Sequence, residues 1–121
     1  MKRDMDLVRK ILLQMEVNDG AMDVSDYRIG EHSRDDTGYH VFLMVDAGLI
    51  AGVDVTEEGQ LHPCWVPSWI TWAGHEFLES SRNETIWIKA KTIIKNKSGA
   101  ATFTLLTQCL AAIAKSQVGI H

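Results

Sequence analysis

The 121-residue sequence predicts an α+β fold, and three observations at its centre support this. Residues 39–47 place apolar side chains at the three-and-four spacing of a helix face. Gly48 follows the last of them, at the position where a left-handed helix cap favours a residue without Cβ. Residues 49–55 then carry apolar side chains at a period of two, as a half-buried strand does. A helix, a glycine stop and a strand therefore follow one another.

This succession is typical of the central helix of a winged helix-turn-helix domain and its entry into the wing. We therefore predict a single domain with two parts, which a chain of this length can support with a modest hydrophobic core. Residues 1–72 form a winged helix-turn-helix-like core, and residues 73–121 form a C-terminal helical extension packed on it.

A first helix is predicted over residues 4–16, with Asp4 as its N-cap and its apolar side chains on one face. The turn-forming residues 18–20 end it. The segment that follows is polar and irregular, but Tyr27-Arg28-Ile29 could form a short strand that pairs with the later wing.

After the first strand, residues 56–60 predict a turn into a second strand, at about residues 64–70. Pro63 and Pro67 make that strand an edge strand or a bulged one, because proline cannot donate a ladder hydrogen bond. Three further helices are then expected: one capped by Thr71, one capped by Asn83, and a last one over residues 101–117.

Composition excludes a membrane protein, because no apolar run approaches the roughly 20 residues that span a bilayer. The first residues lead into an amphipathic helix rather than a signal sequence. Cys64 and Cys109 lack a paired spacing, so free thiols in a reducing cytoplasm are expected. We therefore expect a cytoplasmic protein.

The net charge of −4 is distributed unevenly. Residues 16–60 hold eleven acidic residues and two basic ones, whereas the segments on both sides are basic. The acidic block covers the central helix and the wing entry, which are basic in a protein that reads DNA. This distribution weakens a DNA-binding interpretation of the fold.

Three segments resemble a known family: residues 1–13, residues 39–50, and residues 70–79 followed by Arg82 and Ile86-Trp87. The most specific part is Thr71-Trp72-Ala73-Gly74-His75-Glu76-Phe77-Leu78. The family consists of short bacterial, phage and prophage proteins known only as a numbered domain of unknown function. The resemblance implies a winged-helix-like domain with a helical extension and a bacterial or phage origin. It implies no activity and no site residues.

The chemistry-bearing residues do not form an enzyme pattern. His75-Glu76 is the start of a zinc-protease motif, but position 79 is Glu instead of the second His that the motif requires. We interpret Gly74 instead as a site of close packing at a helix start. His62 and Cys64 could offer two metal ligands, yet no spacing supports a complete set. We expect no catalytic residues, no metal and no cofactor.

Two surfaces are candidates for binding. If Tyr39, Phe42, Leu43 and Ala47 pack inward, the opposite face of the central helix is apolar and lacks the side chains that read bases. We predict a partner-binding surface that combines this face with two of the four tryptophans: Thr37, His40, Val41, Met44, Trp65 and Trp69. The second candidate is a set of lysines that could contact phosphates: Lys89, Lys91, Lys95 and Lys97.

Two functions therefore stay open. The first is a small DNA-associated transcriptional regulator that binds double-stranded DNA, which rests on analogy of fold. The alternative is a protein–protein interaction module, such as a phage accessory protein that binds a host protein. A last helix with two adjacent apolar stripes, one of them formed by Leu105, Cys109 and Ala112, also predicts a homodimer.

Overall fold

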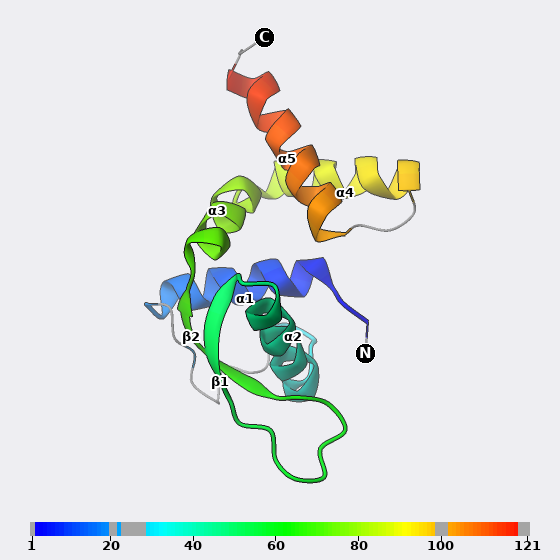
Figure 1. Ribbon diagram of the computed structural model, residues 1–121. Helices are drawn as coiled ribbons and strands as arrows, with labels where there is room; N and C mark the ends of the chain where they lie inside the picture. The colour runs from blue at the N-terminus through cyan, green and yellow to red at the C-terminus, as the bar shows by residue number, and fades with distance from the viewer. Residues whose placement is uncertain (1, 20–21, 23–28, 99–101, 119–121) are drawn as a thin grey trace. The chain divides into compact units, whose positions relative to one another are not determined.

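The computed structural model describes residues 2–19, 22, 29–98 and 102–118 (Figure 1). Within these residues it contains five helices and one two-stranded antiparallel sheet, so the predicted α+β class is confirmed. The winged-helix assignment is compatible with this order of elements and stays a prediction. Most of the strand proposed for Tyr27-Arg28-Ile29 lies outside the described residues. None of the described helices is long and apolar enough to cross a bilayer.

The chain divides into two compact units, Met1–His75 and Glu76–His121. We refer to them as the N-terminal unit and the C-terminal unit. The N-terminal unit contains α1 (Met5–Val17), α2 (Arg34–Asp46), β1 (Ile50–Asp54), β2 (Trp65–Ile70) and the first turn of α3 (Trp72–Ser81). The rest of α3, α4 (Glu84–Ser98) and α5 (Phe103–Val118) form the C-terminal unit.

The predicted helix caps are confirmed. The Asp4 carboxylate accepts hydrogen bonds from the Asp6 and Leu7 amides at the start of α1. At the start of α4 the Asn83 side chain accepts the Ile86 amide at 3.0 Å. Gly48 follows α2 with a φ of 79°, the left-handed conformation that the glycine stop predicts.

The core of the N-terminal unit lies around α2, which contacts α1 and both strands. The buried apolar residues of α1 are Met5, Leu7, Val8, Ile11, Leu12 and Met15. Ile50 and Ile70 are buried at the end of the hairpin where β1 begins and β2 ends. A Cβ at Gly52 would press on the Val45 side chain of α2 at 3.2 Å, so this face of the sheet lies directly on the helix.

The predicted orientation of α2 is wrong. Thr37, His40, Val41 and Met44 are buried, not solvent-facing. The residues expected to pack inward are half-buried or exposed: Tyr39, Phe42, Leu43 and Ala47. The physical reason is that α2 carries apolar side chains on most of its circumference and has neighbours on two sides, so its periodicity does not identify the more deeply buried face.

The two strands pair in antiparallel fashion, with Ile50 opposite Ile70 and Asp54 opposite Trp65. Ala51 lies opposite Trp69, but Gly52 lies opposite Pro67, which leaves Ser68 as an additional residue in β2. The predicted bulge is therefore confirmed.

The start of α3 is fastened to the end of α2. The Thr71 hydroxyl donates to the Gly48 carbonyl at 2.6 Å and accepts the Gly74 amide at 3.2 Å. A Cβ at Gly74 would collide with the Leu49 carbonyl oxygen and with the Ile70 side chain. Thr71 is therefore the predicted cap, and Gly74 allows the predicted close packing.

The C-terminal unit is organised around aromatic contacts. The centroid of the Phe77 ring lies 5.1 Å from that of the Phe103 ring. It lies 6.0 Å from that of the Trp87 ring, which it meets edge-on. The predicted apolar stripe of α5 faces inward at Leu106, Leu110 and Ile113, which are buried. Helices α4 and α5 pack together, with the Cys109 thiol 3.9 Å from the Ala90 carbonyl oxygen.

Candidate interaction surface on the hairpin

The β1–β2 hairpin has two faces, and only one of them lies on α2. Side chains alternate between faces along each strand, so the register places Ala51 beside Trp69 and Val53 beside Val66 on the side away from the core. The bulge at Ser68 keeps Trp69 on the same side as Val66. We call these four residues, Ala51, Val53, Val66 and Trp69, the outer hairpin face.

The outer hairpin face is apolar and accessible. Trp69 is 61% exposed and Val53 is 57% exposed, and all four members of the face are apolar. Strands that are apolar on both faces are typical of sheets that are covered on both sides. The composition of this face is therefore that of a buried surface, although Trp69 and Val53 are exposed in the single chain.

A second exposed tryptophan follows within three residues. Trp72 is the first residue of α3 and is 82% exposed. Helical spacing places it on the other side of α3 from Phe77 and Leu78, both of which are buried. Trp72 was not expected in the partner-binding surface, although its helical spacing from Phe77 and Leu78 was the signal that could have identified it.

The predicted members of the partner-binding surface do not lie on one common surface. Trp69 lies on the accessible face, as expected. Trp65 is half-buried, with its ring 6.0 Å from the Phe42 ring of α2, so it belongs to the inner side of the hairpin. The four α2 residues are in the core and do not contribute to any surface.

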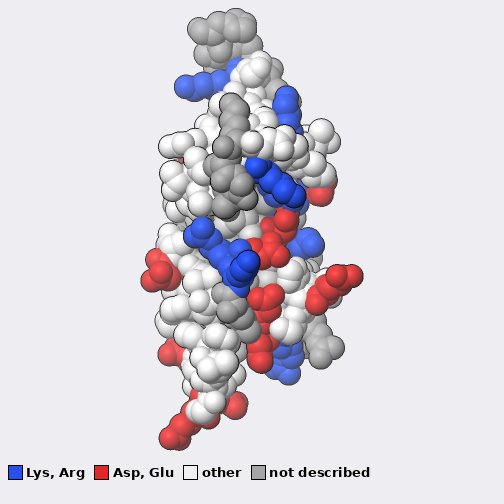
Figure 2. Space-filling model, turned by 90° about the vertical axis from the view of Figure 1, so that its right-hand side faces the viewer, with Lys and Arg blue, Asp and Glu red and all other residues white. Residues whose placement is uncertain are grey.

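The surroundings of the hairpin are acidic. The N-terminal unit carries thirteen acidic and six basic residues in its sequence, a net charge of −7. The loop between the strands carries Glu57 and Glu58, and the lower tip of the molecule in Figure 2 is red. Asp35 and Asp46 at the two ends of α2 are also exposed. The outer hairpin face therefore belongs to a unit with a net negative charge.

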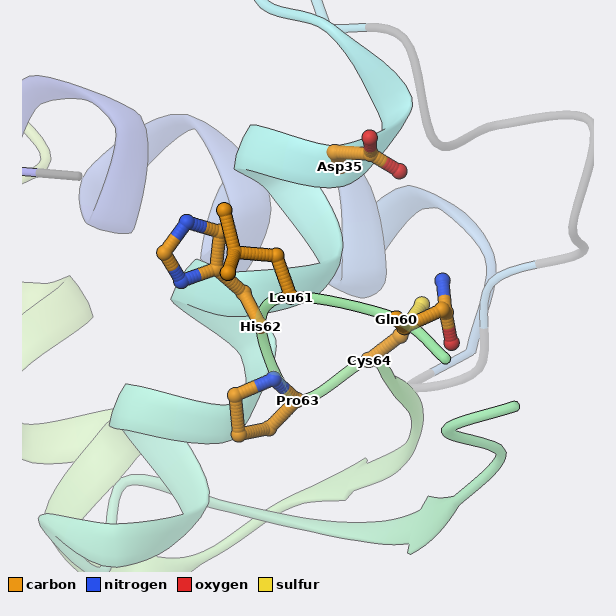
Figure 3. A pocket seen from close by; sticks show the side chains of 6 residues that line it. All are labelled: Asp35, Gln60, Leu61, His62, Pro63 and Cys64. Carbon is orange, nitrogen blue, oxygen red and sulfur yellow. The ribbon is translucent and has the colours of Figure 1, made fainter. Parts of the chain in front are cut away.

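A shallow hollow of about 110 Å³ lies between the start of α2 and the end of the hairpin loop (Figure 3). Its lining includes Asp35 and both residues considered as metal ligands, His62 and Cys64. Burial, followed by the nearby charge of Asp35, raises the pKa of the Cys64 thiol, although Arg34 partly opposes this. The thiolate is the form that attacks electrophiles and binds metals, so this environment disfavours both roles.

Metal binding gains no support elsewhere in the described chain. The His62 ring lies 5.3 Å from the Tyr39 ring, an ordinary aromatic contact. Among the described residues there is no group of three or more His, Cys, Asp and Glu side chains that could hold a metal ion.

The lysines of α4 do not form one basic stripe. At about 100° per residue, Lys91 and Lys95 share a side of the helix, whereas Lys89 is turned away from both. Lys89 and Lys95 are exposed, and the Lys91 ammonium lies over the Trp87 ring at 5.6 Å from its centroid. Lys97 is in α4, but its side chain lies outside the described part of the structure. The described lysines are therefore spread around the helix.

A buried polar cluster joins the start of α1 to α2. The His40 side chain is completely buried, and its Nε2 atom lies 2.8 Å from the Asp4 backbone nitrogen. Its Nδ1 atom lies 2.8 Å from the Asp36 carbonyl oxygen and 3.2 Å from the Asp36 carboxylate. The same carboxylate is 3.2 Å from His32 Nδ1. Both ring nitrogens of His40 are thus paired inside the core.

The chain is similar to proteins that are described only as hypothetical or uncharacterized. It matches the family described as hypothetical protein (DUF2513) over residues 2–100. A protein from Haemophilus influenzae, described as an uncharacterized protein, is 38% identical over 100 residues, which cover 81% of this chain and 82% of the relative. No solved structure is significantly similar.

Proposed function

Because this chain belongs to the DUF2513 family of hypothetical proteins, which brings no activity with it, we propose a function from its own surface: a non-enzymatic protein-interaction module. The observation that carries the proposal is the outer hairpin face with its exposed Trp69 and the neighbouring exposed Trp72. Tryptophan is the residue type most enriched among side chains that dominate binding energy at protein interfaces.

The charge around this face defines the partner. The loop of the hairpin carries Glu57 and Glu58 and the N-terminal unit has a net negative charge, so a complementary protein surface carries Lys and Arg around aliphatic or aromatic residues. Its cationic side chains can also lie over the tryptophan rings, which are the best aromatic acceptors of such contacts. A second copy of the same acidic unit would be repelled. A host protein whose contact surface carries basic residues around apolar ones would attract this unit and would not be repelled by it.

A peptide selection tests the proposal without a known partner. Random dodecapeptides displayed on phage are selected against the wild-type protein, and enriched sequences are synthesised and titrated by fluorescence anisotropy. We expect peptides that combine Lys or Arg with apolar residues. Their affinity should fall at least tenfold when Trp69 and Trp72 are both changed to Ala, which corresponds to about 1.4 kcal/mol.

The matched control is Ile88→Ser, which removes an exposed apolar side chain from the C-terminal unit. It should bind the selected peptides as the wild type does. Selection of acidic peptides, or equal loss of affinity in the control and the double variant, would overturn the proposal.

The DNA-associated regulator has less support. Exposed Lys89 and Lys95 favour it, but they lie on separate sides of α4, and the exposed ends of α2 are acidic. It predicts binding of a labelled mixed-sequence duplex that is around micromolar at low salt and weakens steeply as salt rises. It also predicts loss of that binding when Lys89, Lys91 and Lys95 become Glu. Anisotropy that stays flat at low salt would eliminate the regulator.

A further inference from the structure

The hydrogen bonds of His40 determine which of its nitrogens carries a proton. The Asp4 backbone N–H can only donate, so Nε2, at 2.8 Å, must be an unprotonated acceptor. The Asp36 carbonyl oxygen can only accept, so Nδ1, also at 2.8 Å, must carry the hydrogen. The ring is therefore neutral in this structure, in one defined tautomer.

Protonation of Nε2 is incompatible with this arrangement. The added proton would face the Asp4 N–H across 2.8 Å, so that two donors would oppose each other at a completely buried ring. On the other side of the ring nothing has to change, because the Asp36 carboxylate lies 3.2 Å from Nδ1 and stabilises a positive ring. The positive ring keeps its contacts within α2 and loses its contact with α1.

We propose that His40 is a pH-dependent latch, which holds the start of α1 against α2 when neutral and releases it when protonated. The released part is the N-cap region of α1, where Asp4 accepts the Asp6 and Leu7 amides.

The residues that contact the His40 ring come from both packed helices. The Asp4 backbone amide, just before α1, and the Asp36 carboxylate of α2 lie against it, and α1 also carries the buried Arg9. His32, which precedes α2, shares the Asp36 carboxylate, and its Nε2 atom is 3.9 Å from the Asp4 carboxylate. The Tyr39 ring meets the His40 ring edge-on at 6.2 Å between centroids. The strands contribute only Asp54, which is exposed.

Nuclear magnetic resonance of the full chain tests the latch. The Asp4 amide and the His40 ring nitrogens are followed from about pH 7.5 to about pH 5. In the wild type we expect the Asp4 amide resonance to move upfield as its hydrogen bond is lost, in step with protonation of His40 Nε2. An Asp4 amide resonance that stays unchanged over this range would overturn the proposal.

Two variants separate His40 from its neighbour. His40→Gln keeps an acceptor for the Asp4 amide and cannot be protonated, so the pH response of Asp4 should disappear. His32→Gln removes the other imidazole of the cluster and should leave the response intact. If His32→Gln abolishes the response, or His40→Gln retains it, the latch does not depend on His40. Should His40→Gln fail to fold, the His40 ring resonances of the wild type decide the question alone.

Discussion

Cys64 shows how a single residue is shaped by its surroundings. Its thiol lies in the hollow beside Asp35, where burial and the neighbouring carboxylate both disfavour the thiolate and raise the pKa. We expect iodoacetamide to alkylate Cys64 more slowly than a free cysteine between about pH 7 and pH 9, because the thiolate is the nucleophile. Peptide mass spectrometry resolves Cys64 from Cys109 and measures both rates.

The variant Asp35→Asn tests how much the Asp35 charge contributes to the raised pKa of Cys64. It removes one of the charges that raise the pKa of Cys64, so alkylation should become faster at each pH. The raised pKa of Cys64 also makes the free energy of unfolding depend on pH. It is unaffected at neutral pH and decreases above about pH 8.5, the ordinary pKa of an unfolded thiol, because the unfolded chain ionises there first. Alkylation of Cys64 at the rate of free cysteine would contradict the assignment.

At the scale of elements, the contact between the start of α3 and residue 49 decides how closely the helix approaches the hairpin. Gly74 has no Cβ, and an added Cβ would collide with the Leu49 carbonyl oxygen, which cannot move without breaking its bond to the Thr71 amide. Glycine-to-alanine changes inside a helix ordinarily stabilise by up to about 1 kcal/mol. Here we expect Gly74→Ala to destabilise the protein by about 1–3 kcal/mol, because the site is already filled.

Urea unfolding monitored by circular dichroism measures the effect. The control is Ala73→Ser at the preceding residue, which is exposed and should change the stability by less than about 0.5 kcal/mol. Unchanged or increased stability of Gly74→Ala would show that the start of α3 does not pack closely on residue 49.

At the scale of the whole molecule, the sequence predicts a homodimer through the second apolar stripe of α5. Leu105 is 37% exposed, Cys109 is half-buried and Ala112 is exposed, so part of this stripe is accessible in the single chain. We expect light scattering at tens of micromolar to give the mass of two chains. Leu105→Glu should give one chain, because it places a charge in the contact, whereas Thr104→Glu on the exposed side of α5 should not. A monomeric wild type would exclude the homodimer.

The charge distribution is also a property of the whole chain. The N-terminal unit has a net charge of −7 and the C-terminal unit a net charge of +3 in the sequence. A protein partner bound through the outer hairpin face should therefore bind more weakly as salt rises, since screening reduces the attraction of a basic partner to the acidic unit.

The sequence by itself determined the features that depend on local chemistry. Asp4, Thr71 and Asn83 begin helices because their side chains accept amides within the next few residues, and Gly48 ends α2 because only a residue without Cβ adopts its conformation easily. The bulge in β2 is one of the two alternatives, an edge strand or a bulged one, that Pro63 and Pro67 predicted. Each of these depends on residues that are close in the chain.

The tertiary structure decided which apolar surfaces are buried. Because α2 is apolar on most sides, only its neighbours α1 and the hairpin determine that His40, Val41 and Met44 face the core. The Asp4 amide that pairs with His40 lies 36 residues away, so no local pattern could reveal it. Trp65 and Trp69 look alike in the sequence, yet one contacts α2 and the other is exposed, because the register and the bulge of the hairpin assign them to opposite faces.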